Sequence, residues 1–132
     1  MKIAMGTNDG LRLNDGFFEN SRQFRIIEFK NGEIVSDTMR ANPYAESIDP
    51  ASFQRQTDKM MTLLEDCSLF MGQLMHKDFV AAFRAEKIDC IVTDIDDINQ
   101  ALSLYLYDES ERFKYYSLQS GAFVPCSRRS PS

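Results

Sequence analysis

The sequence predicts a three-layer α/β domain built on a mixed five-stranded sheet. Two observations carry this prediction: a hairpin signal at Asn31-Gly32, and short apolar strands that alternate with amphipathic helices further along the chain. The 132 residues correspond to one ordinary domain. A chain of this length buries enough apolar surface to fold without a disulfide or a bound metal.

The first half of the chain predicts a strand and a hairpin. Residues 1–6 form a short apolar run that turn-favouring residues end. The strand-like runs 23–30 and 33–40 flank Asn31-Gly32. Asn-Gly favours a type I′ turn, because both central residues of that turn need positive φ. We therefore expect the two runs to pair as an antiparallel hairpin.

The second half alternates helices with strands. The expected elements are an amphipathic helix capped by Ser52, a strand at 67–71, a helix at about 78–86, a strand at 88–93 and a helix that starts near Asp94, with Asp97 at a capping position. Short, wholly apolar strands are typical of a sheet covered by helices on both faces. Right-handed crossovers then make the strands at Ile3, Leu69 and Ile91 parallel.

The domain is expected to span residues 1–110. Residues 111–126 are rich in aromatic side chains and are expected to pack on the domain as an extension, with an edge strand as one form of this packing. Residues 127–132 are polar and are expected to be a disordered tail.

Composition excludes several classes of protein. The net charge is −5 and the sequence pI is about 4.8, and phosphate contacts need a basic stripe that this chain lacks, so we expect no nucleic-acid partner. The apolar N-terminal run is too short for a signal peptide or a membrane span. Cys67, Cys90 and Cys126 are isolated and odd in number, as expected for reduced thiols in a cytoplasmic protein.

The expected topology locates a candidate site. Ligands of open parallel sheets bind beyond the carboxyl ends of the strands, where the loops diverge. Residues 6–10, 72–78 and 93–97 lie at that edge. The residues singled out there as candidate binding residues are Thr7, Asn8, Gly72, Met75 and His76.

His76 is the one histidine of the chain, and it precedes a predicted helix. It is a candidate metal ligand together with the thioethers of Met5, Met71 or Met75. Imidazole and thioether ligands suit copper(I), iron or cluster-type cofactors better than magnesium. An ordinary exposed loop histidine is the alternative, and the sequence leaves both open.

Two further groups of residues have structural explanations that outweigh the functional ones. Asp94, Asp96 and Asp97 could hold magnesium, but carboxylates at a helix start are favoured by capping and by the helix dipole. Cys67 and Cys90 begin their strands at the opposite edge of the sheet, where we expect them to be packed in the core.

Three segments resemble the dinitrogenase iron–molybdenum cofactor biosynthesis family. They are MKIAMGTNDG, the hairpin QFRIIEFKNGEIVSDTMRANPY and the block LLEDCSLFMGQLMHKDFVAAFRAEKIDCIVTDIDDINQAL, and the resemblance covers residues 1–107. It implies a ribonuclease-H-like α/β/α fold. Members implicated in nitrogenase assembly, and so in nitrogen fixation, bind or carry iron–sulfur precursors and the iron–molybdenum cofactor.

The chain departs from the family pattern at two places. Phe17-Phe18-Glu19 stands where many members have His-Phe-Gly, so that histidine is absent. Gln73 follows Gly72, and the family's second glycine after the strand is not kept. A carrier without the usual ligand would use His76 and sulfur side chains instead.

We therefore expect a non-enzymatic carrier or assembly accessory for an iron–sulfur or iron–molybdenum type cofactor, acting with an assembly or acceptor protein. His76 would be its metal ligand. The alternative is a cofactor-free interaction module that binds a protein through Phe17-Phe18 or Tyr115-Tyr116. A magnesium-dependent hydrolase is a distant third, and the oligomeric state stays open.

Overall fold

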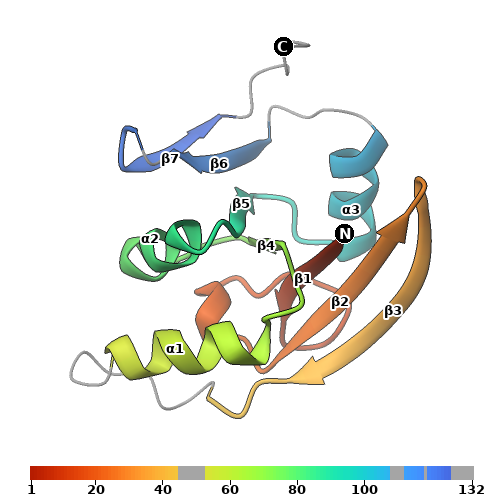
Figure 1. Ribbon diagram of the computed structural model, residues 1–132. Coiled ribbons are helices and arrows are strands. Elements are labelled where there is room, and N and C mark those ends of the chain that lie inside the picture. Colours follow the sequence, from red (N-terminus) through yellow and green to blue (C-terminus); the bar gives the residue numbers. More distant parts are fainter. Residues whose placement is uncertain (45–52, 108–111, 118, 126–132) are drawn as a thin grey trace.

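The computed structural model describes residues 1–44, 53–107, 112–117 and 119–125 (Figure 1). Its elements in chain order are β1 (Lys2–Thr7), the 3-10 helix η1 (Phe18–Asn20), β2 (Gln23–Lys30), β3 (Glu33–Ala41), α1 (Phe53–Leu63), β4 (Leu69–Gly72), α2 (Lys77–Ala85), β5 (Asp89–Thr93), α3 (Ile98–Tyr107), β6 (Phe113–Ser117) and β7 (Ala122–Pro125). Ser52, Cys126 and the tail 127–132, on which three expectations rest, lie outside the described residues.

One mixed sheet runs through the molecule in the strand order β3-β2-β1-β4-β5-β6-β7. β1, β4 and β5 are parallel, and the other neighbours are antiparallel. The parallel arrangement of the strands at Ile3, Leu69 and Ile91 is therefore confirmed. The prediction of five strands is wrong: the sheet continues past β5 into β6 and β7, which add two strands.

The sheet separates two apolar clusters (Figure 1). α1 and α2 cover one face, where Met60, Phe79 and Phe83 meet strand residues such as Phe70. α3 covers the other face, where Ile98, Ala101 and Leu102 pack on strand residues that include Ile3 and Ile91. Alternation along β1 explains the division, because successive side chains of a strand point to opposite faces. The three layers predicted from the sequence are thus present.

The predicted hairpin is confirmed. β2 and β3 pair antiparallel across a turn in which Asn31 has φ 55° and Gly32 has φ 80°. These are the positive φ values that an Asn-Gly turn requires. The register shifts between Glu28 and Phe29 at the hairpin end of the ladder, and the rest of the pairing is regular. β3 has no neighbour on its outer side and is an edge of the sheet.

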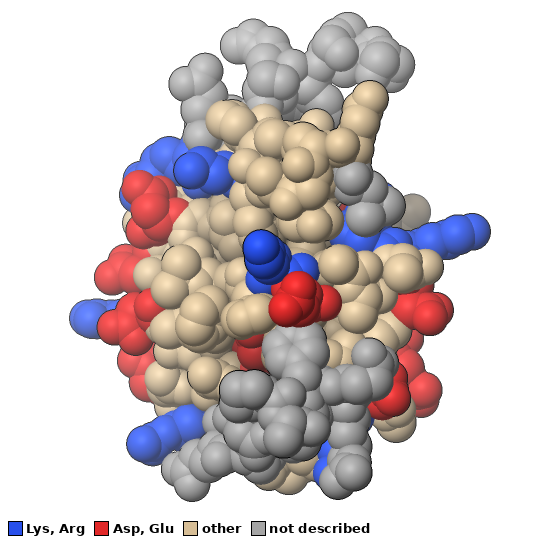
Figure 2. All heavy atoms as spheres, turned by 90° about the vertical axis from the view of Figure 1, so that its left-hand side faces the viewer, with Lys and Arg blue, Asp and Glu red and all other residues tan. Residues whose placement is uncertain are grey.

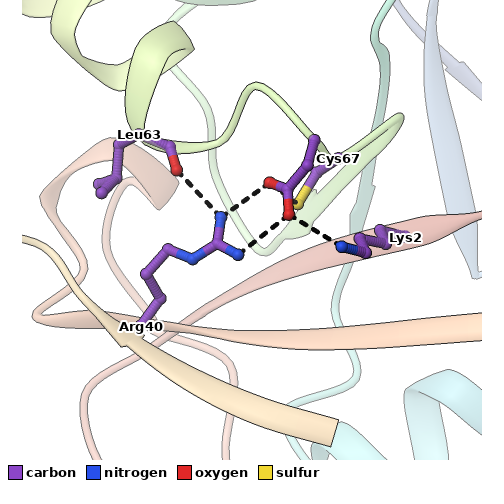
Figure 3. Close-up of polar contacts among 5 residues, drawn as sticks. Lys2, Arg40, Leu63 and Cys67 are labelled. Atoms are coloured by element: carbon purple, nitrogen blue, oxygen red, sulfur yellow. Dashed lines mark hydrogen bonds and ion pairs between the residues drawn. The ribbon is translucent and has the colours of Figure 1, made fainter. Parts of the chain in front are cut away.

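An ion-paired group ties three elements together at the amino end of the parallel strands (Figure 3). The Arg40 guanidinium donates to both Asp66 carboxylate oxygens, at 2.8 and 3.1 Å, and to the Leu63 carbonyl oxygen at the end of α1. Lys2 Nζ on β1 lies 3.0 Å from Asp66 Oδ2. Arg40 and Lys2 hold the pKa of Asp66 well below its usual range.

Charges of both signs share the surface. Figure 2 shows the side on which α2 lies, and there basic and acidic side chains are interspersed, with a basic and an acidic group side by side near the centre of the view. In the described part of the chain, no helix has the length and apolarity that a membrane crossing requires.

Candidate functional site

The described loops at the carboxyl ends of the parallel strands enclose two adjoining pockets. The first has a volume of about 500 Å³ and is lined by Asn8, Asp9, Arg12, Leu13, Asn14, Asp15, Gln73, Asp94 and Asp96. The second, of about 560 Å³, is lined by Asp15, Gln73, Leu74, Val92, Thr93, Asp94, Arg112 and Lys114. Asp15, Gln73 and Asp94 line both pockets. This is the edge that the topology predicted, since ligands of parallel sheets bind there.

Thr7 shapes the first loop from inside. Its hydroxyl is buried, donates to the Arg12 carbonyl oxygen and accepts from the Gly10 N–H at 2.9 Å. Asp9 Oδ1 accepts from the N–H groups of Leu11 and Arg12 at 2.9 Å each, which lowers the pKa of Asp9. Thr7 therefore positions the pocket wall and does not present its hydroxyl to the pocket.

Asn8 lines the first pocket, yet its side chain also holds the loop together. Its Oδ1 accepts from the Arg22 N–H at 3.0 Å, and its Nδ2 donates to Asn14 Oδ1 at 3.1 Å. Asn14 is buried and donates in turn to the Phe17 carbonyl oxygen at 2.9 Å. Of the five candidate binding residues, Asn8 alone belongs to the lining of the two described pockets.

Gly72 serves packing. A Cβ atom at this position would lie 3.2 Å from the Phe18 Cβ, so the absence of a side chain lets η1 approach β4. Met75 is buried in the α1–α2 cluster, and Met5 and Met71 are buried in the α3 cluster. The three thioethers that the sequence offered as soft ligands are therefore core side chains, away from the lining of both pockets.

His76 caps a helix. It precedes Lys77, the first residue of α2, and its Nδ1 accepts from the Asp78 N–H at 3.3 Å. An imidazole that accepts at Nδ1 carries its proton on Nε2 when it is neutral. Metal binding at Nε2 would require a change of tautomer and the loss of this cap bond. The side chain is 43% exposed and lies outside the lining of the two pockets.

Glu19 is a buried carboxyl beside the His76 backbone, outside the lining of the two pockets, and the sequence did not indicate its burial. The residue is 2% exposed. Its Oε2 accepts from the His76 N–H at 3.1 Å, and its Oε1 has no hydrogen-bond partner among the described residues. Burial raises the pKa of Glu19 to about 7, and the hydrogen bonds from backbone N–H groups offset this only in part.

The aspartates of the third loop have different roles. Asp97 Oδ1 accepts from the Gln100 N–H at 2.9 Å, so the predicted cap of α3 is confirmed. The helix begins at Ile98 rather than near Asp94, because residues 94–96 form a loop that holds Leu13 through the Asp96 carbonyl oxygen. Asp94 pairs with Arg112 at 3.0 Å and lines both pockets.

The cysteines do not contribute to the edge. Cys67 and Cys90 are both buried, as expected, and they lie in the α1–α2 cluster. Burial raises the pKa of each thiol to about 12. A thiol with such a pKa stays protonated near neutral pH and is a poor metal ligand.

The pocket walls that the sequence reasoning missed come from two sources. Gln73 directly follows β4, and the same edge rule that selected Gly72 could have found it. Asp15, Arg112 and Lys114 reach the edge through tertiary structure: the first loop folds over the strand ends, and β6 pairs with β5. No local pattern in the sequence indicates these positions.

The donor set of the pockets does not fit an iron–sulfur or iron–molybdenum group held by coordination. Such groups bind thiolate and imidazole ligands, and the two linings consist of carboxylate, amide, hydroxyl, basic and aliphatic side chains. Among the described residues, no three His, Cys, Asp or Glu side chains lie together as a metal site would require.

The two aromatic pairs proposed as contacts are each divided between surface and core. Phe17 is exposed and its ring centroid lies 6.0 Å from that of His76, whereas Phe18 is fully buried. Tyr115 is exposed and Tyr116 is buried. One member of each pair thus completes the core and the other faces solvent.

Comparison with protein families finds one match. The family model described as "Dinitrogenase iron-molybdenum cofactor" matches residues 1–107. No curated protein sequence matches the chain.

Comparison with solved structures finds the same fold in distant proteins. The protein PH0822 is 11% identical, with a TM-score of 0.65 over 80% of this chain and 90% of that one. A candidate dinitrogenase of Methanocaldococcus jannaschii is 16% identical, with a TM-score of 0.60 over 98% and 97% of the two chains. A candidate NifB protein of Thermotoga is 10% identical, with a TM-score of 0.56 over 79% and 85%. At these identities the likeness concerns the fold.

Proposed function

Because the chain belongs to the dinitrogenase iron–molybdenum cofactor family, we propose that it is an accessory protein in the assembly or handling of an iron–sulfur or iron–molybdenum type cofactor. The observation that supports this role is the pair of adjoining pockets at the carboxyl edge of the sheet. We also propose that the fold is of the ribonuclease-H-like type, as the family resemblance implies.

The proposed role is that of a non-enzymatic carrier. The pocket walls offer hydrogen-bond donors and acceptors, namely the Gln73 amide, the Asn8 amide and the Arg112–Asp94 pair. A cofactor or precursor would be held there by polar contacts with its outer atoms, because soft metal ligands are absent from the linings. Such a hold is weaker than coordination and suits a protein that passes its cargo on.

The partner in this proposal is a cofactor-assembly or acceptor protein. Phe17 and Leu74 are exposed beside the pockets, and the two residues form a parallel bridge. Exposed apolar side chains with a polar rim are typical of protein contacts. Asp15, Asp94, Arg112 and Lys114 line the second pocket together with Leu74, so the partner surface in this proposal carries charges of both signs.

Anaerobic reconstitution with a preassembled cluster tests the carrier role. The purified chain is mixed with an iron–sulfur cluster whose iron atoms keep their own small thiolate ligands, separated from unbound cluster, and measured by absorption and metal analysis. We expect bound iron that is lost in the Gln73→Ala, Asp15→Ala double variant, because polar contacts in the pockets hold the outer atoms of the cluster. It should be retained in His76→Asn, because Asn keeps the helix cap. If iron is lost in His76→Asn and retained in the double variant, His76 is the metal ligand and the pockets are not the binding site.

A cofactor-free interaction module is the second candidate, and the buried thioethers and capped histidine favour it. In that case reconstitution yields no bound iron in any variant. Binding to a purified cofactor-assembly protein would persist, and Phe17→Ser with Leu74→Ser would weaken it. Both residues are exposed, so the double variant should fold.

A further inference from the structure

β3 exposes large apolar side chains at an edge of the sheet that has no neighbouring strand among the described residues. Three of its side chains are large, apolar and about half exposed: Ile34 at 50%, Val35 at 51% and Met39 at 46%. Leu11 is 66% exposed, and a Cβ at the neighbouring Gly10 would lie 3.7 Å from the Met39 methyl carbon. Exposed apolar side chains that gather on one element mark an interaction surface more often than isolated ones do.

The backbone of this edge selects an extended partner. β3 pairs with β2 on one side and has no neighbour on the other, so alternate N–H and C=O groups of its nine residues point outward. Another strand can pair with such a row along its whole length.

The edge is only partly protected against pairing. Proline and charged side chains, lysine above all, are common means of preventing edge pairing. The sequence Glu33–Ala41 contains neither proline nor lysine. Two of its three charged side chains, Asp37 and Arg40, are neutralised by ion pairs within the chain. A bulge is a further means, and the one register shift in the ladder lies near the hairpin turn, between Glu28 and Phe29. It leaves Ser36–Ala41 regular.

We propose that the β3 edge pairs antiparallel with the β3 edge of a second copy of this chain, which forms a two-fold dimer with one continuous sheet. The choice of a second copy rests on the self-complementary order of side chains along the strand. With Asp37 on the two-fold axis, Val35 of one copy lies opposite Met39 of the other. In the same register Ser36 lies opposite Thr38.

This register places Val35 against Met39 and hydroxyl against hydroxyl, which are favourable cross-strand pairs. It also places Ile34 against Arg40, whose guanidinium is held by Asp66 of its own copy. Met39 and Asp37 lie opposite Arg25 and Ile27 of β2, so they share the face of the sheet that α3 covers. Val35 is the residue that the register shift adds to β3. Two residues of a bulged strand oppose one residue of its neighbour. The Val35 side chain therefore lies on the same face of the sheet as those of Asp37 and Met39.

The charges at the axis are compatible with this pairing. Two Asp37 side chains would meet there, but each is already bound by Arg25 of its own copy, with Nε–Oδ1 at 3.0 Å and Nη2–Oδ2 at 2.7 Å. The charges across the axis would therefore follow the order Arg25, Asp37, Asp37, Arg25, and each guanidinium offsets part of the repulsion between the two carboxylates. An isologous contact of this kind closes after two copies and does not propagate.

Sedimentation and native mass spectrometry test the proposal. We expect a reversible dimer at about 100 μM chain, the micromolar range typical of modest interfaces. Val35→Lys and Met39→Glu are each expected to raise the dimer dissociation constant at least about tenfold. An equimolar mixture of the two variants should restore a dimer, now of one copy of each, because the introduced ammonium group would then face the introduced carboxylate.

Tyr115→Lys is the matched control, since Tyr115 is 45% exposed on β6, which four other strands separate from β3. It should leave the dimer intact. Circular dichroism and the unfolding midpoint verify that each variant folds, and either variant alone is sufficient for the test. A chain that stays monomeric at about 500 μM, a dimer that survives both substitutions, or a mixture that fails to pair would each overturn the proposal.

Discussion

Glu19 shows how much one buried side chain can determine. Its unfolded-state pKa is close to 4.5, and its pKa in the folded protein is about 7. The folded state therefore binds more protons than the unfolded state between these values, and the free energy of unfolding decreases as pH rises through this interval. Below pH 4.5 the carboxyl is protonated in both states, and stability from this group is fully present.

We expect Glu19→Gln to remove this pH dependence. At about pH 8 the variant should be more stable than the parent chain by roughly 3 kcal/mol, because the amide needs no desolvation of a charge. At about pH 4 the two should be nearly equal. Urea unfolding at both pH values measures the difference. Glu86→Gln, at an exposed position, should show none.

His76 makes a second prediction at this scale. His76→Ala removes the acceptor for the Asp78 N–H and should destabilise the protein by about 1 kcal/mol. His76→Asn should recover most of the loss, because asparagine caps helices well. Thermal or urea unfolding compares the three chains. Equal loss in both variants would show that the imidazole contributes something other than a cap.

The η1 segment depends on a glycine in the adjoining strand. Gly72→Ala would place a Cβ 3.2 Å from the Phe18 Cβ, and Phe18 is fully buried. We expect a loss of about 1–3 kcal/mol in unfolding free energy, the usual effect of overpacking. Gly16→Ala is the control, because its Cβ would meet nothing nearer than 3.6 Å.

The Arg40–Asp66–Lys2 group joins β3, β1 and the end of α1. Asp66→Asn should lower the unfolding free energy by about 1 kcal/mol at neutral pH, the scale of half-exposed ion pairs. The folded-state pKa of Asp66 is lowered, so this stabilisation exists above pH 3.8 and is lost as pH falls below it. The difference between parent and variant should therefore shrink in acid. A difference independent of pH would contradict the ion-pair explanation.

An element can be predicted from the sequence when the residues that determine it lie close to one another along the chain. The hairpin and the Asp97 cap depend on residues within a few positions of one another, so the sequence alone was sufficient. The start of α3 was placed too early because Asp94 and Asp96 also favour helix starts. Their loop conformation depends on Leu13, which belongs to a distant part of the chain.

The candidate site was predictable as an edge and not as a set of side chains. The carboxyl ends of parallel strands meet at one edge of a sheet, and the alternation of helices with apolar strands is sufficient to predict that these strands are parallel. His76 and Thr7 accept hydrogen bonds from backbone N–H groups of their own loops. The sequence does not show that these acceptor atoms already have partners and are not available to a ligand. Glu19 was missed because a single acidic residue in a polar segment resembles any surface residue.

At the scale of the whole molecule, the core extends beyond the family match. The match ends at residue 107, while Phe113 is 1% exposed and its ring meets that of Tyr105 at 5.6 Å. We expect Phe113→Ala to lower the unfolding free energy by about 3–5 kcal/mol. Tyr115→Ala, on the same strand and exposed, should change it by less than about 1 kcal/mol. A loss in Phe113→Ala as small as that expected for Tyr115→Ala would mean that β6 is dispensable for the core.

The strand order has a consequence for how the chain acquires its structure. Every neighbouring pair in the sheet except β1–β4 joins strands that follow one another along the chain. The hairpin side and the C-terminal side can thus each assemble from short-range contacts. Their union requires one long closure, in which Ile3 meets Leu69, and the entropy of closing that loop is the main barrier that depends on distance along the chain. The folding rate should accordingly be most sensitive to side chains along the β1–β4 seam, and much less so to those in either outer pair.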